Sequence, residues 1–203
     1  MTTATKLSEM MVQLYGKKDA QAVYDRCQEI DPWFNQYVQT VVYDQLWALE
    51  PLSLTQKSLV TIVVLAILKK EEQLQIHLKG FFNLGGTHQD ITQLFSYLLT
   101  EKQIDIPDKL FSILHHVNAG NTEKHTTKCD AFLTPTNRTF INLAALIATG
   151  DHDKMKTLLA DQIHNKTLSQ DEIKGTFRHA MTYCGCPCAM NAFALLREVQ
   201  EKH

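Results

Sequence analysis

KSLVTIVVLAILKKEEQLQIHLKGFFNLGGTHQDITQLFSY, residues 57–97, is the stretch that decides the fold of this chain. A second stretch shares its order of features: residues 138–179, RTFINLAALIATGDHDKMKTLLADQIHNKTLSQDEIKGTFRH. The two stretches align at an offset of 81 positions (138 − 57), which becomes 82 after a one-residue insertion. Each copy passes from an apolar helix through a charged break to an amphipathic helix, and then through a Thr or Ser cap to another helix. A duplicated unit of this kind predicts two halves packed on one core.

The remainder of the chain also shows helical spacing of its apolar residues. Only 8 Gly and 5 Pro occur in 203 residues, and no long stretch alternates apolar and polar residues. The pattern predicts an all-α protein of about ten helices, arranged as two pseudo-equivalent repeats. The expected organisation is a pair of N-terminal helices (1–52), a first unit (53–117), a polar linker (118–136) and a second unit (137–203).

Composition and charge exclude several functional classes. The formal net charge of −2 gives no electrostatic support for binding nucleic acid. The longest apolar run, residues 59–68, is far too short to span a membrane, and the first 18 residues lack the apolar segment of a signal peptide. Five cysteines, an odd number, argue against a secreted disulfide framework. We therefore expect a cytoplasmic protein with no nucleic-acid or membrane partner.

A histidine marks the clearest difference between the two copies. His77 in the first copy corresponds to Leu158 in the second. His77 shares the apolar stripe of its helix with Leu74 and Phe81, and Lys70 precedes it by seven residues on the same predicted face. An imidazole in apolar surroundings can act as an acid or a base. The alternative is a core histidine satisfied by one backbone carbonyl.

Three cysteines form the second candidate site, in the segment Tyr183-Cys184-Gly185-Cys186-Pro187-Cys188. If the last helix begins at Pro187, Cys188 lies in its first turn, where the helix dipole favours a thiolate. The three thiols could form a redox pair, or bind a soft metal with His179 as the nearest further ligand. The remaining interpretation is that these cysteines pack as small apolar residues.

The segment LSLTQKSLVTIVVLAILKKEEQLQIHLKGFFNLGGTHQDI resembles the carboxymuconolactone decarboxylase family. The shared elements are a leucine followed by a histidine (Leu74, His77), an Asn-x-Gly stop (83–85) and an acidic helix start (87–91). The C-terminal YCGCPCAMNAF looks like the closing segment of the family. The resemblance extends over most of residues 30–200 and implies an alkylhydroperoxidase-D-like helical bundle.

Two chemistries occur in that family, and the resemblance implies one or the other here. One branch decarboxylates a muconolactone, and the other reduces peroxides or disulfides with a Cys-x-x-Cys pair and a glutamate. The cysteine positions of the second branch fall on Lys70 and Gln73, and the glutamate position on Ser58, so the usual dithiol is absent.

We therefore expect a cofactor-free, decarboxylase-like lyase in preference to a peroxidase. In that interpretation His77 is a proton donor to an enolate carbon, and Lys70 stabilises the carboxylate or the enolate. One alternative is a thiol-dependent antioxidant that uses Cys184, Cys186 and Cys188. The other is a non-catalytic oligomeric scaffold that binds a ligand or a partner.

The resemblance also carries expectations about assembly and ligands. Family units assemble into trimers or hexamers, so a chain with two units is expected to form a pseudo-hexameric homotrimer. The expected ligand is a small-molecule substrate, with no cofactor and no metal ion. The resemblance does not identify that substrate.

Overall fold

The protein is an all-α bundle, as the sequence predicts. The computed structural model describes residues 6–118 and 132–202, and every regular element in these two ranges is a helix. The helices are α1 (Glu9–Ile30), α2 (Pro32–Tyr37), the π-helix η1 (Val38–Trp47), α3 (Leu54–Ile67), α4 (Glu71–Asn83), α5 (His88–Thr100), α6 (Lys109–Asn118), α7 (Pro135–Thr149), α8 (His152–Asn165), α9 (Gln170–Cys184) and α10 (Cys186–Gln200).

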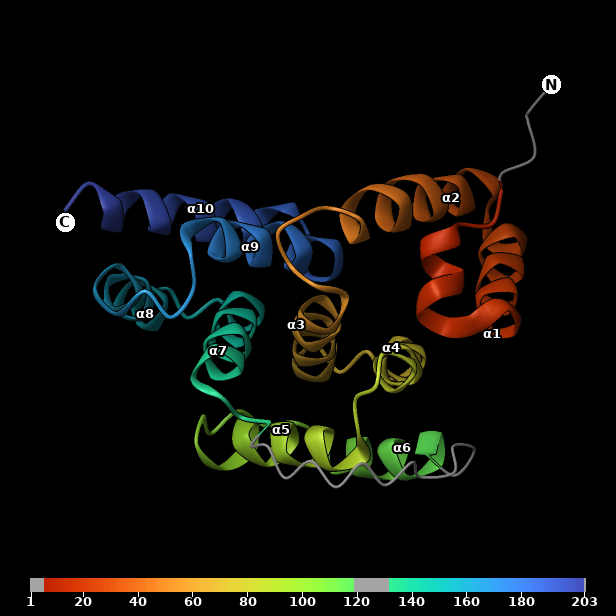
Figure 1. Cartoon of the computed structure of the whole chain (residues 1–203), viewed down its shortest axis with the longest axis horizontal. Helices are drawn as coiled ribbons and strands as arrows, with labels where there is room; N and C mark the ends of the chain where they lie inside the picture. Colours follow the sequence, from red (N-terminus) through yellow and green to blue (C-terminus); the bar gives the residue numbers. More distant parts are fainter. Residues whose placement is uncertain (1–5, 119–131, 203) are drawn as a thin grey trace.

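The helices form layers around a central pair. Helix α3 packs against α7, α4 and α9, and α7 also contacts α8 and α9. In Figure 1, α5 and α6 run along the lower edge of the molecule, while α9 and α10 run along the upper edge. Helix α3 is buried on most sides because apolar residues occupy nearly its whole circumference. The central position of this helix brings segments from both halves of the chain to one core.

Side-chain caps define the helix starts that the sequence predicts. Capping boxes lie at the starts of α3, α5 and α9. They pair Ser53 with Gln56, Thr87 with Asp90, and Ser169 with Glu172. Each box satisfies two backbone N–H groups that the helix itself cannot pair, and loss of such a cap typically costs about 1 kcal/mol.

The helix boundaries recur at nearly constant spacing along the chain. The first residues of α7 and α8 follow those of α3 and α4 by 81 positions, and α9 follows α5 by 82. Two residues with a positive φ are also 82 positions apart: Gln103, three residues after the end of α5, and Gly185, directly after the end of α9. The duplication itself stays a prediction, and these recurring boundaries support it.

Two boundaries differ from the sequence-based expectation. Helix α7 begins at Pro135, so the predicted linker ends before residue 136; residues 119–131 of that linker lie outside the described ranges. The last helix begins at Cys186 rather than Pro187, because Gly185 takes the cap position with φ 87°. Helix α1 is interrupted at Gly16, whose φ of 76° is accessible to glycine at little cost.

The N-terminal helices form a layer of their own, which we call the N-terminal layer (α1, α2 and η1). It has a small core separate from that of the bundle, composed of Met11, Leu14, Tyr15, Ala20, Tyr43 and Trp47. This layer contacts the bundle through α4, which packs against α1, and through α9, which packs against η1. Aromatic side chains of the layer are thereby brought against α4.

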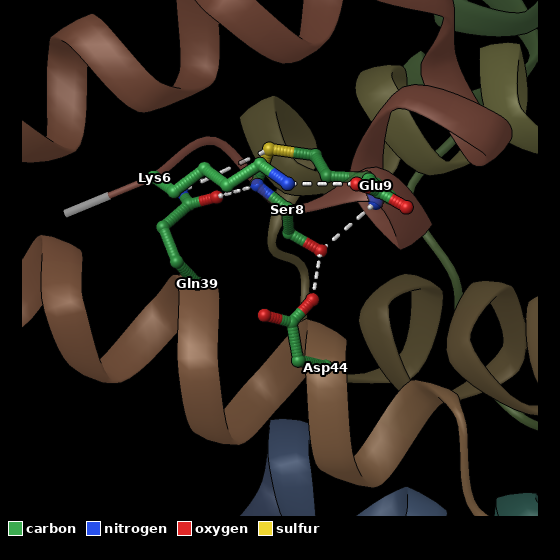
Figure 2. A network of polar contacts seen from close by, with 6 residues as sticks. Lys6, Ser8, Glu9, Gln39 and Asp44 are labelled. Carbon is green, nitrogen blue, oxygen red and sulfur yellow. Dashed lines mark hydrogen bonds and ion pairs between the residues drawn. The ribbon is translucent and has the colours of Figure 1, made fainter.

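Hydrogen bonds fasten α1 to η1, as Figure 2 shows. The backbone N–H of Ser8 donates to Oε1 of Gln39 at 2.9 Å, and the Ser8 hydroxyl donates to the carboxylate of Asp44. Gln39 is fully buried and donates in turn to Oδ1 of Asn35 at 3.1 Å. Because buried polar groups are costly to separate from their partners, these bonds hold the layer together as one unit.

No helix in residues 6–118 or 132–202 is both long enough and apolar enough to cross a bilayer.

Candidate functional site

His77 lies in α4 at the boundary between the bundle and the N-terminal layer. Its side chain is only 5% exposed. The indole ring of Trp47 stacks on the imidazole with centroids 5.8 Å apart and an interplanar angle of 7°. The ring of Tyr183, from α9, meets the same imidazole edge to face at 5.2 Å. Two aromatic rings from distant parts of the chain therefore enclose His77.

A chain of hydroxyl groups leads away from the imidazole. The hydroxyl of Tyr15 lies 2.9 Å from Nδ1 of His77, and the hydroxyl of Tyr43 lies 3.1 Å from that of Tyr15. Burial raises the pKa of both tyrosines, so both phenols keep their protons. When Tyr15 donates to Nδ1, the imidazole carries its own proton on Nε2.

Burial controls the protonation of His77. Loss of solvent lowers its pKa from 6.5 to about 3. The ring is therefore neutral throughout the physiological pH range in this closed arrangement. A neutral imidazole can accept a proton or donate an N–H hydrogen bond, whereas it cannot release the proton of an imidazolium. The sequence-based role of a simple acid thus needs the relay of the hydroxyl groups.

A second buried histidine lies beside the first. Nε2 of His179 is 2.9 Å from Oγ1 of Thr61, and the ring meets Trp47 edge to face at 4.8 Å. Burial, followed by the nearby Lys57 and His77, lowers the pKa of His179 to about 3. Nδ1 of His179 is buried without a hydrogen-bond partner among the described residues. The backbone of Lys57 lies close enough to this ring to oppose part of that decrease in pKa.

The structure records no contact between Lys70 and His77, and the role expected for Lys70 stays a prediction. Lys70 is the exposed cap residue of α4 and has non-helical backbone angles (φ −90°, ψ 72°). The buried ammonium group near the histidines belongs to Lys57, whose Nζ donates to the Trp47 carbonyl at 2.8 Å. Burial lowers the pKa of Lys57, and Glu50 acts in the opposite direction.

The cysteines of the C-terminal segment are free thiols in the structure, and they differ in exposure. Cys186 is exposed, while Cys184 and Cys188 are partly buried against the main core. The Cys184 thiol donates to the Ala180 carbonyl at 3.1 Å. Burial, together with the neighbouring Cys188, raises the pKa of Cys184 to about 12. Such a thiol is almost entirely protonated at neutral pH, which opposes a nucleophilic role.

In the two described ranges, no group of three or more His, Cys, Asp and Glu side chains is arranged to hold a metal ion.

The sequence pattern does not identify several of the residues that surround His77. Tyr15 and Tyr43 lie 62 and 34 positions away from His77 and belong to helices whose packing no local pattern reveals. Trp47 looks like an ordinary apolar anchor of its helix, and His179 stood out only as a neighbour of the cysteines. Lys57 could have been found, because it occupies the repeat position of Arg138 at the start of a very apolar helix.

Comparison with known proteins supports one family for the second half of the chain. Residues 121–198 match the carboxymuconolactone decarboxylase family. The chain is 27% identical to the 4-carboxymuconolactone decarboxylase of Acinetobacter baylyi (strain ATCC 33305 / BD413 / ADP1) over 86 residues, which is 42% of this chain and 64% of that relative. The alignment therefore spans a little less than two thirds of the relative. His77 precedes the residues that match the family.

Proposed function

We propose that this protein is a small-molecule enzyme of the carboxymuconolactone decarboxylase type and that His77 is its acid–base group, because residues 121–198 match the model of that family. The observation that carries the proposal is the continuous path from Nδ1 of His77 through the hydroxyls of Tyr15 and Tyr43, with spacings of 2.9 and 3.1 Å. A path of this kind can return a proton to an imidazole that has given one away.

The proposed reaction is the loss of carbon dioxide from a carboxylated lactone without a cofactor. The breaking C–C bond leaves its electron pair on the substrate as an enolate. The Nε2 proton of His77 passes to the enolate carbon, while Nδ1 receives the proton of Tyr15. Tyr15 takes the proton of Tyr43, and water restores the proton of Tyr43 and leaves as hydroxide. The starting tautomer returns when the Nδ1 proton passes back along the two hydroxyl groups while Nε2 takes a proton from water that enters as the product leaves. The net change is the replacement of the carboxylate by a hydrogen atom.

Substrate can reach His77 only when the N-terminal layer moves, since Trp47 covers the imidazole. In this proposal the layer moves as one body, held together by its own core and internal hydrogen bonds, while its contacts with α4, such as the 3.0 Å hydrogen bond from Asn83 to the Leu14 carbonyl, break. Closure over a bound substrate would exclude water and strengthen the hydrogen bonds around the reacting carbon.

The thiol-dependent alternative is less well supported by the site. Its nucleophile would have to be a thiolate, and the pKa of about 12 at Cys184 disfavours that form. No described contact joins a sulfur atom of Cys184, Cys186 or Cys188 to His77.

Soaking crystals with carboxylated lactones tests the proposed site. We expect density for the ligand between His77 and Trp47, together with displacement of the indole ring. His77→Gln crystals should keep the fold and bind the same ligand, because glutamine retains hydrogen-bonding groups at this place. Ligand density found only at other places in the molecule would contradict the assignment of this site.

A further inference from the structure

The structure contains an open cavity of about 740 Å³ beside α7 and α8, and residues of both halves of the chain line it. Its walls come from α7, α8 and residues 102–105, with Ile67 of α3 at one side. The volume lies in the range of pockets that hold small organic ligands. His77 is not among the residues that line it.

The cavity occupies the place in the second half that corresponds to the surroundings of His77 in the first. Leu158 and Asn142 line the cavity and stand 81 positions after His77 and Thr61. The hydrogen bonds correspond as well. Thr61 pairs with His179 at 2.9 Å, and Asn142 pairs with Tyr97 at 2.9 Å, where Tyr97 precedes His179 by 82 positions.

The N-terminal layer fills the corresponding space in the first half. The Trp47 indole covers His77, and the ring of Tyr15 lies against Gly80, where an added Cβ would be only 2.8 Å from a ring carbon. Asp161 lines the cavity at the position that corresponds to Gly80. In the first half, therefore, the planar two-ring indole of Trp47 packs on α4. The cavity offers a comparable space beside α8, the corresponding helix of the second half.

The polar groups at the cavity indicate what such a ligand should carry. The Tyr97 hydroxyl donates to Oδ1 of Asn142, so the N–H donors of this amide remain for a ligand. The Lys102 ammonium lies over the Tyr97 ring at 5.1 Å, and no carboxylate of the described residues pairs with it. Donors without acceptors favour a ligand rich in acceptor atoms, such as a carboxylate.

The acidic groups of the cavity wall already have partners. Asp105 pairs with Lys69 at 3.3 Å, and Asp161 accepts a hydrogen bond from Asn165 at 2.6 Å. The charge of Asp105 is thus partly compensated by Lys69, whereas the amide of Asn165 satisfies one oxygen of Asp161 and leaves its charge in place. The apolar part of the wall suits the flat face of a ring system, and it consists of Ile67, Ile104, Ala145, Leu146 and Leu158.

We propose that this cavity is a second ligand site, distinct from the His77 cluster, which binds a two-ring aromatic carboxylate. The ring system lies against Leu146 and Leu158, and the carboxylate accepts hydrogen bonds from Asn142 and Lys102. The proposal does not depend on catalysis at His77, because it concerns other residues and a binding equilibrium.

Titration with 2-naphthoate, followed by its fluorescence, tests the site. We expect a dissociation constant on the order of 100 µM, and binding of the neutral analogue 2-naphthylmethanol at least about tenfold weaker. Equal affinity for the acid and the alcohol, or no binding of 2-naphthoate at millimolar concentration, would overturn the proposal.

Matched variants locate the binding. Lys102→Gln and Asn142→Leu should each weaken 2-naphthoate binding by about tenfold, since each removes a donor to the carboxylate. Lys202→Gln is the control: it removes an exposed lysine that does not line the cavity, and it should leave the affinity for 2-naphthoate unchanged. Leu158→Trp should abolish binding by filling the cavity. If the tryptophan variant fails to fold, the two donor variants decide, and wild-type affinity in both of them refutes the assignment.

Discussion

Trp47 and His77 form a parallel ring stack, with centroids 5.8 Å apart and an angle of 7° between the planes. The two residues belong to η1 and α4, so the stack joins the N-terminal layer to the bundle. The same indole donates its N–H to the Tyr183 hydroxyl at 2.9 Å. Trp47 thus connects the N-terminal layer to both α4 and α9.

Replacing this tryptophan should weaken the whole protein. Trp47 is fully buried, and we expect Trp47→Ala to lower the free energy of unfolding by about 3–5 kcal/mol, because a large cavity is left beside His77. Urea denaturation measures the loss. Trp33→Ala is the matched control, since the Trp33 side chain is 71% exposed and its removal should cost less than about 0.5 kcal/mol. Similar losses in the two variants would mean that Trp47 does not fasten the layer.

The buried histidines should make stability depend on pH. The pKa of His77 falls from 6.5 to about 3 in the folded state, so between these values the unfolded chain binds a proton that the folded chain does not. Stability from this group is complete above pH 6.5 and is lost as the pH falls towards 3. Between pH 6.5 and 5 the loss should be about 2 kcal/mol for each such histidine.

Unfolding experiments at several pH values measure that slope. His179 has its pKa lowered to about 3 as well, so His179→Gln should reduce the slope in the same way as His77→Gln. His152→Gln, at an exposed position, serves as the control substitution. An unchanged slope in both buried-site variants would show that these rings are accessible to protons in the folded protein.

The three C-terminal cysteines should react in an order set by their surroundings. Cys186 is exposed and should be alkylated first, whereas Cys184 should be last, because burial raises its pKa to about 12. Mass spectrometry of the native protein during timed iodoacetamide treatment measures the order, with Cys186→Ser to identify the fast site. A mass loss of two protons after mild peroxide would instead reveal a disulfide and favour the thiol-dependent alternative.

Much of the fold follows from local patterns in the sequence. Capping pairs such as Thr87 with Asp90 are spaced three residues apart, so sequence inspection finds the helix starts directly. The interruption at Gly16 and the burial of α3 follow from residue type and apolar content. The π-helix at 38–47 could not be predicted, because its sequence is equally compatible with ordinary α-helical spacing.

The sequence pattern singles out only some members of the cluster around His77. His77 itself stands out because it replaces a leucine on an apolar stripe, and the burial of that face follows from its spacing. Its partners Tyr15 and Trp47 come from helices that pack on α4 through tertiary contacts, which periodicity does not specify. Lys70 has different surroundings from those of His77. It shares the angular position of His77, but it lies at the exposed start of the helix, roughly 10 Å along the axis from the histidine.

The rate of carbon dioxide release from carboxylated lactones tests the central claim most directly. The rate should be compared among four proteins: the wild type, His77→Gln, Tyr15→Phe and Lys70→Gln. Circular dichroism first confirms that all four are folded. We expect His77→Gln to lower the rate at least about 100-fold, Tyr15→Phe to lower it less, and Lys70→Gln to retain it. Turnover of a lactone substrate at the wild-type rate by His77→Gln would contradict the assignment of His77 as the acid–base group.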